Sequence, residues 1–260
     1  MNAILFHSCT REELSTLAQE GCPVVIPLAA TEQHGPHLPV FTDSLISEYI
    51  SKEAVQLASS ASGNPFLLAP IVSIGCSQHH IAFGGTISFR STTYLAMLHD
   101  ILESLVSCGF TNIIMLNCHG GNEPVMLQAV NDMAVKHKGW FAAASYWNLI
   151  PSSQKQQLTD VFGPTPGHAG AFETSAIMAI QPDWINDAAI SDQHHSVPWH
   201  QHALPNTFLG KQGTLTGFDG YTDSAIQASR EKGQWALDQI VIPAVSEWLQ
   251  QMAAAMKVEV

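Results

Sequence analysis

Apolar runs that alternate with helical segments constrain the fold of this chain more than any other feature of its sequence. The runs have the length and composition of buried strands, and the segments between them repeat apolar residues at helical spacing. The predicted strands cover residues 24–30, 66–75, 112–117 and 140–147, where 66–75 is one strand or a strand pair. The predicted helices cover residues 43–60, 94–106 and 123–137. Such alternation builds a parallel sheet with helices on both faces. We therefore predict an α/β fold, a three-layer α/β/α sandwich with a central, mainly parallel sheet.

The chain has 260 residues and no stretch with the composition of a linker. We therefore predict a single domain over residues 1–260. The capping-box pattern from Thr10 to Glu13 predicts an early helix, and an amphipathic helix over residues 224–256 is expected to close the domain. Residues 184–223 are polar and contain Pro, Gly and His, so we expect them to form long surface loops or subunit contacts.

Composition excludes some classes of partner. The formal net charge is -12, with only 10 Lys and Arg, so the chain lacks the basic footprint that nucleic acids require. Charged residues make up only 12% of the chain, which indicates a surface partly covered by subunit contacts and predicts a homo-oligomer.

The expected location is the cytoplasm, without a membrane partner. No stretch approaches the ~18 apolar residues of a membrane span, and the first residues lack the pattern of a signal peptide. Five cysteines without a Cys-x-x-Cys pair are typical of reduced thiols.

The loop that follows the first long strand carries three potential metal ligands. Glu32 and His34 leave the strand end two residues apart and on the same side, and Asp43 stands at the start of the next helix. Two carboxylates and an imidazole within a dozen residues suit Zn, Mn or Fe. The alternative is that Asp43 caps the helix and Glu32 is solvated.

Two later segments add further candidates. His119 follows the strand at residues 112–117 and precedes two glycines, which let the backbone approach an ion or substrate closely. His119 could instead be a strand-end histidine bonded to a backbone carbonyl. His168 lies on a turn flanked by glycines, and Glu173 lies in an apolar helix start, where burial without a partner would be costly.

These side chains favour a pair of metal ions. Two imidazoles and three carboxylates carry too much negative charge for one divalent ion, but they suit two ions that share a bridging carboxylate. Asp43 is the natural bridge; Glu32 and His119 would bind one ion, and His34 and Glu173 the other. A hydroxide between the ions could attack an amide carbon, and His168 could carry the proton to the leaving nitrogen.

A serine or cysteine hydrolase is the competing enzyme class. The sequence contains no Gly-x-Ser-x-Gly elbow, and Cys118 is the only plausible thiol nucleophile. We interpret Cys118 as a packing residue, since a cysteine at a strand end usually behaves as a small hydrophobic residue.

Four motifs in order resemble the creatininase (creatinine amidohydrolase) family. They are E-Q-H-G-P-H-L-P...D, a G-x-S-x-H-H loop with G-T-I-S, N-x-H-G-G-N, and G-H-A-G-x-x-E-T, and they lie between residues 24 and 180. The resemblance implies a three-layer α/β/α fold and two divalent metal ions per chain, with Zn first and Mn or Fe as alternatives. It also implies hydrolysis of a cyclic or linear amide and a homo-oligomer, commonly a hexamer.

The resemblance also assigns roles to individual positions. The metal-binding roles fall on Glu32, His34, Asp43, His119 and Glu173, and the catalytic roles fall on His168 and Glu173. The substrate-side positions resemble Ser77, His79, His80, Gly120 and Trp147.

The chain departs from the true creatininases at two places. Gly120 and Gly121 replace an aromatic residue and a metal-binding glutamate, and residues 164–166 replace a tryptophan. The aromatic wall that would stack on a flat ring is thus partly missing. Creatinine or a related cyclic amide remains the first substrate candidate, and a formamide, as for deformylase-like members of the family, is the alternative. A phosphorylated substrate would need basic residues, for which Arg90 is the candidate.

Two other classes of function stay open at this point. A catalytically silent metal-binding oligomer would keep the ligands but would have no use for His168, and an isomerase or lyase could use the same ions on a sugar-like substrate. Four further histidines are interpreted as loop surface, because no carboxylate shares their spacing; they are His194, His195, His200 and His202.

Overall fold

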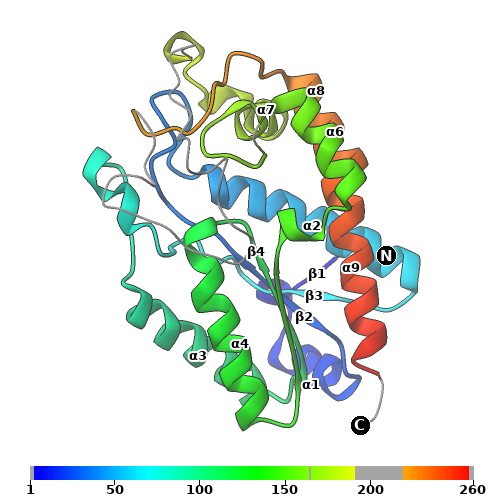
Figure 1. Ribbon diagram of the computed structural model, residues 1–260. Helices are drawn as coiled ribbons and strands as arrows, with labels where there is room; N and C mark the ends of the chain where they lie inside the picture. Colours follow the sequence, from blue (N-terminus) through cyan, green and yellow to red (C-terminus); the bar gives the residue numbers. More distant parts are fainter. Residues whose placement is uncertain (1–2, 164, 191–218, 258–260) are drawn as a thin grey trace.

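A parallel sheet forms the centre of the molecule. The computed structural model describes residues 3–163, 165–190 and 219–257. The described strands form one sheet in the order β1-β3-β2-β4-β5, with every neighbouring pair parallel. They are β1 (Ile4–Leu5), β2 (Val24–Leu28), β3 (Leu67–Leu68), β4 (Asn112–Asn117) and β5 (Trp140–Ser145). Strands β2 and β4 pair along their whole shared length and lie in the middle of the molecule (Figure 1).

Helices cover both faces of the sheet. They are α1 (Arg11–Gln19), α2 (Thr42–Ser62), α3 (Ser91–Ser107), α4 (Glu123–Lys136), α5 (Tyr146–Leu149), α6 (Ser152–Phe162), α7 (Ala171–Ile180), α8 (Arg230–Ala236) and α9 (Ile242–Ala255). Helices α1, α3 and α4 share one apolar core with Val24 and Ile26, whereas α2 and α5 to α9 share a second core with Val25. Alternate residues of β2 thus face opposite cores. The predicted three-layer α/β/α sandwich is confirmed.

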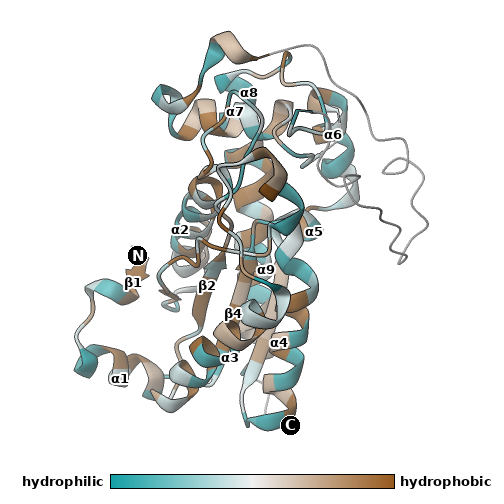
Figure 2. Ribbon diagram, turned by 90° about the vertical axis from the view of Figure 1, so that its left-hand side faces the viewer, coloured by the Kyte–Doolittle hydropathy of each residue, from teal (hydrophilic) through white to brown (hydrophobic). Residues whose placement is uncertain are grey.

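The two central strands are apolar over nearly their whole length (Figure 2). All five residues of β2 and the last five of β4 are buried, as expected for strands covered on both faces. Their carboxyl ends lie at the same edge of the sheet, which is where ligands bind in open α/β folds.

Most of the predicted boundaries are confirmed, and one strand prediction is wrong. Strand β4 covers residues 112–117 as predicted, and α1 begins after the capping box of Thr10 and Glu13. The strand predicted over residues 66–75 is limited to Leu67–Leu68. Pro70 follows shortly after and has no N–H for a ladder hydrogen bond, and only an isolated bridge from Leu28 to Val72 lies beyond it.

Several predicted ends also shift. The strand predicted to reach residue 30 ends at Leu28, and the helix predicted from residue 94 begins at Ser91. The strand predicted to reach residue 147 ends at Ser145, and the short helix α5 follows. The helix predicted from residue 224 begins at Arg230, because the Ser229 hydroxyl caps it by accepting from the Lys232 N–H at 3.3 Å. A π-helical turn, Leu237–Val241, then joins α8 to α9.

Two further predictions concern membrane-spanning helices and four histidines of the C-terminal half. Among the described residues, no helix combines the length and apolar character needed to cross a bilayer. The interpretation of His194, His195, His200 and His202 as loop surface lies outside the described residues.

Candidate metal centre

The candidate ligands come from four places at the carboxyl edge of the sheet. Glu32 and His34 lie in the loop after β2, Asp43 lies in the first turn of α2, and His119 follows β4. The loop after β2 folds back on itself, since the Glu32 N–H donates to the Val40 carbonyl at 2.9 Å. The fourth place is the first turn of α7, which holds Glu173.

Asp43 lies between two imidazoles. Its Oδ1 is 3.1 Å from His34 Nε2, and its Oδ2 is 3.0 Å from His119 Nδ1. Glu32 Oε1 lies 3.4 Å from the same His119 atom, and Glu173 Oε2 lies 3.8 Å from the same His34 atom. The structure therefore brings all five predicted ligands together, with Asp43 in the middle and one further carboxylate beside each histidine.

The chemistry of this donor set fits divalent cations. Ligand atoms of Glu32, His34 and Asp43 all lie within 4.8 Å of one another, as do those of His34, His168 and Glu173. Glu32 Oε2 is buried and has no hydrogen-bond partner among the described residues. A buried carboxylate oxygen without a partner is costly, whereas nitrogen and oxygen atoms in this arrangement are suitable ligands for Zn, Mn or Fe.

The buried carboxylates of the centre favour positively charged or protonated neighbours, as two raised pKa values show. Burial disfavours a charge on His34, but Asp43 and Glu173 outweigh it and raise the His34 pKa to about 10. Burial raises the pKa of Glu173 to about 8, although His34 opposes this shift. The buried carboxylates thus hold protons on their neighbours when no other cation is present.

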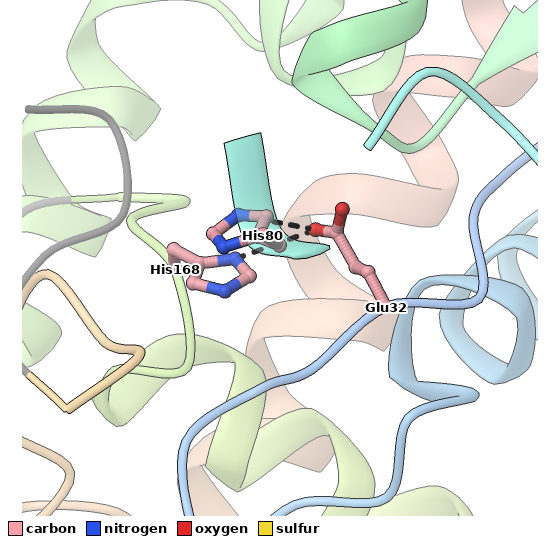
Figure 3. Close-up of side chains that lie close together, drawn as sticks. All are labelled: Glu32, His80 and His168. Carbon is pink, nitrogen blue, oxygen red and sulfur yellow. Dashed lines mark ion pairs between the residues drawn. The ribbon is translucent and has the colours of Figure 1, made fainter. Parts of the chain in front are cut away.

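His80 and His168 lie beside Glu32 in the same centre. Each has one ring nitrogen 3.6 Å from Glu32 Oε1, His80 through Nε2 and His168 through Nδ1 (Figure 3). Their rings stack, with centroids 4.2 Å apart. Burial, followed by the neighbouring His34, lowers the pKa of His168 well below its usual value. A neutral imidazole in this position can accept a proton.

Of the predicted substrate-side residues, Ser77, His79 and Gly120 lie beside His119, whereas His80 lies beside Glu32 and His168. Ser77 Oγ lies 3.2 Å from His119 Nε2, and the His79 ring stacks on the His119 ring at 6.0 Å. No atom lies within 4 Å of the place that a Cβ on Gly120 would take. Trp147 lies in α5, packs edge-to-face on Tyr146 and contacts the apolar core.

Cys118 has the properties of a packing residue. It is buried in the core formed by α2 and α5 to α9. Burial raises the pKa of its thiol to about 12, and a thiol that stays protonated is a poor nucleophile. Arg90, the candidate for a phosphate, is exposed just before α3.

The expectation that residues 184–223 form surface loops or subunit contacts lies mostly outside the described residues, and the surface-loop prediction is wrong for the described end of the segment. Gly220, Tyr221 and Asp223 are buried. The His168 N–H donates to Thr222 Oγ1 at 2.8 Å, and the Thr222 N–H donates to the His168 carbonyl at 3.0 Å. This segment holds the turn that carries His168. Polar composition predicted exposure here, and a contact across more than fifty residues leaves no local pattern in the sequence.

Gln33 is a second residue that the sequence analysis missed. Its carboxamide nitrogen lies 2.7 Å from His80 Nδ1 and 3.1 Å from His168 Nε2. The signal was present, since Gln33 separates two predicted ligands. A carboxamide, however, is neither an acid nor a base nor a typical ligand of these metals, so the sequence analysis did not select it.

Comparison with known proteins identifies the family. The model of the creatininase family, described as creatinine amidohydrolase, matches residues 7–247. The chain belongs to the creatininase family. The resemblance predicted from the four motifs is confirmed.

Two named relatives differ in what they act on. A mycofactocin precursor peptide peptidase of Mycobacterium tuberculosis (strain ATCC 25618 / H37Rv) is 31% identical over 175 residues, which are 65% of this chain and 62% of the relative. The creatinine amidohydrolase of Pseudomonas putida is 25% identical over 244 residues, 88% of this chain and 89% of the relative. The chain thus spans about three fifths of the length of the mycofactocin peptidases that it matches.

Solved creatininase structures share the fold. A crystal structure of creatinine amidohydrolase has a TM-score of 0.78 at 22% identity, with 100% of both chains covered. A creatininase described as the Mn form has a TM-score of 0.79 at 22% identity, with 98% of this chain and 100% of the other covered.

Proposed function

We propose that this protein is a binuclear metal-dependent amidohydrolase that cleaves the C–N bond of a small amide. The observation that carries the proposal is the position of Asp43, which directs one carboxylate oxygen toward each of two buried histidines. A single-ion site has no need for this symmetry, whereas a carboxylate shared by two ions requires it. Neighbouring creatininases described as Mn and Zn-Zn forms support the choice of metals.

Each residue then has a defined role. Glu32 and His119 would hold one ion, His34 and Glu173 would hold the other, and Asp43 would contact both. When bound, two such ions generate a nucleophile from water at neutral pH and polarise the amide carbonyl. His168 would accept the proton of the attacking water and donate it to the leaving nitrogen as the C–N bond breaks.

Creatinine is the first substrate to test, because the P. putida relative named for it matches nearly the whole chain. A linear amide, such as a formamide or a peptide bond, is a second candidate. Gly120 favours it, since the space beside this residue is empty and no side chain there can stack on a flat ring. The mycofactocin relatives, which share up to 31% identity with this chain, are named as peptidases of a precursor peptide.

The proposal extends to the assembly. Exposed apolar side chains such as Ile81, Phe83 and Ile87, together with the low content of charged residues, support a homo-oligomer. The hexamer implied by the family stays a prediction that sedimentation analysis can test, and the cytoplasmic location also stays a prediction.

The decisive experiment is elemental analysis of the purified protein beside Glu173→Ala. We expect about two ions per chain, and about one in the variant, because a binuclear centre loses one of its two sites with this carboxylate. Glu247→Ala, at an exposed position of α9, is the matched control and should keep both ions.

Turnover of creatinine, formamides and short peptides is then measured on the same samples. One ion or none in the wild type, unchanged by Glu173→Ala, would show that Glu173 is structural and that the binuclear assignment is wrong. Two ions without turnover of any amide would instead favour a catalytically silent metal-binding protein.

A further inference from the structure

Gln33 lies at the edge of the two stacked histidines beside the candidate metal centre. The residue is buried, and its carboxamide nitrogen contacts both rings, at 2.7 Å from His80 Nδ1 and 3.1 Å from His168 Nε2. Figure 3 shows the two rings stacked face to face beside Glu32. One side chain thus contacts both imidazoles of the stack on the side away from Glu32.

The carboxamide has only one possible orientation. Its Oε1 accepts a hydrogen bond from the Gly35 N–H at 3.0 Å, so the oxygen and the nitrogen of the amide cannot be exchanged. Gly220 covers the same oxygen so closely that a Cβ at this position would lie 1.9 Å from it. The backbone N–H of Gly35 and the absent side chain of Gly220 together fix Gln33 in place.

This orientation determines which nitrogen of His80 carries a proton. An amide nitrogen only donates hydrogen bonds, so His80 Nδ1 accepts one from Gln33. In a neutral imidazole the proton is then on Nε2, which is the atom 3.6 Å from Glu32 Oε1. His80 therefore directs an N–H group into the centre.

His168 is held by Gln33 through two atoms. Its Nε2 lies 3.1 Å from the carboxamide nitrogen and 3.1 Å from the backbone carbonyl oxygen of Gln33. One ring nitrogen cannot accept from the first and donate to the second in the same state. The tautomer with the proton on Nε2, which donates to the carbonyl, leaves Nδ1 free to accept a proton, and the carboxamide then packs against the same edge of the ring. With this edge of the ring fixed, and with one face stacked on His80, the opposite nitrogen Nδ1 points at Glu32 Oε1. The ring cannot turn without losing both contacts to Gln33.

We propose that Gln33 is a positioning residue, whose carboxamide fixes the tautomer of His80 and aligns the ring of His168 for proton transfer. This inference rests on the proposed function in one respect, the role of His168. It assigns no metal-binding role to Gln33 itself. The competing interpretation is that Gln33 merely stabilises the loop of residues 31–40 through Gly35.

The test compares two variants of equal length with a control. Gln33→Met removes the hydrogen bonds and keeps the length of the side chain, whereas Gln33→Glu keeps the shape and replaces the donor by an acceptor. Gln128→Met is the control, because Gln128 is an exposed glutamine of α4 whose carboxamide donates to Asp132 one turn along the same helix. Metal content, kcat and KM for a turned-over amide, and thermal stability are measured for all four proteins.

A spectroscopic measurement tests the tautomer without relying on activity. Solid-state ¹⁵N NMR of histidine-labelled protein, measured without and with added zinc, reports which ring nitrogen is protonated. The His80 signals are identified by their loss in His80→Asn. In the wild type we expect the proton on Nε2 of His80. In Gln33→Glu we expect it on Nδ1, because the carboxylate accepts where the amide donated, and in Gln33→Met we expect a mixture.

The Gln33→Met variant should also differ from the wild type in kcat. Misalignment of a proton-transferring group costs about 100-fold in rate, so kcat of Gln33→Met should fall about 100-fold. Its KM should change less than about threefold, its metal content should equal that of the wild type, and Gln128→Met should match the wild type throughout.

Two results would overturn the inference. An unchanged His80 tautomer in both variants would show that Gln33 does not fix it, and loss of metal in parallel with kcat would show that Gln33 only supports the ligand loop. Failure of the proposed function has a different signature. A wild type that binds no metal and turns over no amide would refute the amidohydrolase, while the tautomer measured on the purified protein would still test Gln33.

Discussion

Two adjacent glycines after His119 are under different constraints. A Cβ on Gly121 would lie 2.0 Å from the Cys76 carbonyl oxygen and 2.6 Å from His119 Nε2, whereas a Cβ on Gly120 would meet no atom within 4 Å. We expect Gly121→Ala to lower the free energy of unfolding by about 1–3 kcal/mol, the usual cost of overpacking. Gly120→Ala should leave it nearly unchanged. Thermal unfolding of the two variants measures the difference.

The same clash explains why the chain departs from the true creatininases at this place. A glutamate at position 121 would need room that the Cys76 backbone occupies, so in the proposed binuclear centre the second ion would obtain its carboxylate from Glu173. Equal melting temperatures of Gly121→Ala and Gly120→Ala would contradict this explanation.

The five candidate ligands were predictable from the sequence because each is a carboxylate or an imidazole at a strand end or a helix start. Gln33 and Thr222 were not predictable in this way. The role of Gln33 depends on which groups face its carboxamide, and Thr222 bonds to a residue 54 positions away. Local patterns carry no information about such contacts.

At the scale of elements, the bounds of helices and strands were predicted best where a single pattern of apolar residues extends over several helical turns or a whole strand. Strand β4 is flanked by Gly109 on one side and polar residues on the other, and its bounds were predicted correctly. Residues 66–72 after α2 are all apolar, so the sequence pattern predicted a longer strand and did not show that Pro70 interrupts the hydrogen bonds of the sheet. The start of α8 was missed because Ser224 and Ser229 are equally good caps by composition.

Close packing of α7 against α8 makes Gly233 a sensitive position. A Cβ there would lie 1.9 Å from the Ser175 carbonyl oxygen and 2.9 Å from the Ala176 N. Helix propensity alone predicts that Gly233→Ala stabilises the protein by about 1 kcal/mol. We expect the opposite sign, a loss of about 1–3 kcal/mol, together with weaker binding of the ion assigned to Glu173 on α7.

Thermal unfolding and metal analysis of Gly233→Ala measure both effects. Gln251→Ala, at an exposed position of α9, is the control and should change neither. A stabilised Gly233→Ala variant with full metal content would show that α7 and α8 can separate at little cost.

At the scale of the whole molecule, the candidate centre joins segments that the chain order keeps far apart. The loop after β2, the start of α2, the end of β4 and the start of α7 contribute one or two ligands each. Without an ion, these buried carboxylates either face protonated histidines such as His34 or take up a proton themselves, as the raised pKa of Glu173 indicates. Buried ion pairs are costly. Bound ions should therefore stabilise the whole fold and not merely the active site.

Removal of the ions measures this effect. A ligand that binds only the folded state stabilises it by about 2.7 kcal/mol at a free concentration of 100 times Kd. In a domain of this size that corresponds to a fall in Tm of about 5–10 °C upon chelation, which added zinc should reverse. Asp43→Asn, which lacks the proposed bridge, should show a much smaller response to the chelator. An unchanged wild-type Tm after verified loss of the ions would mean that the four segments hold the centre together without metal, and that the ions serve chemistry alone.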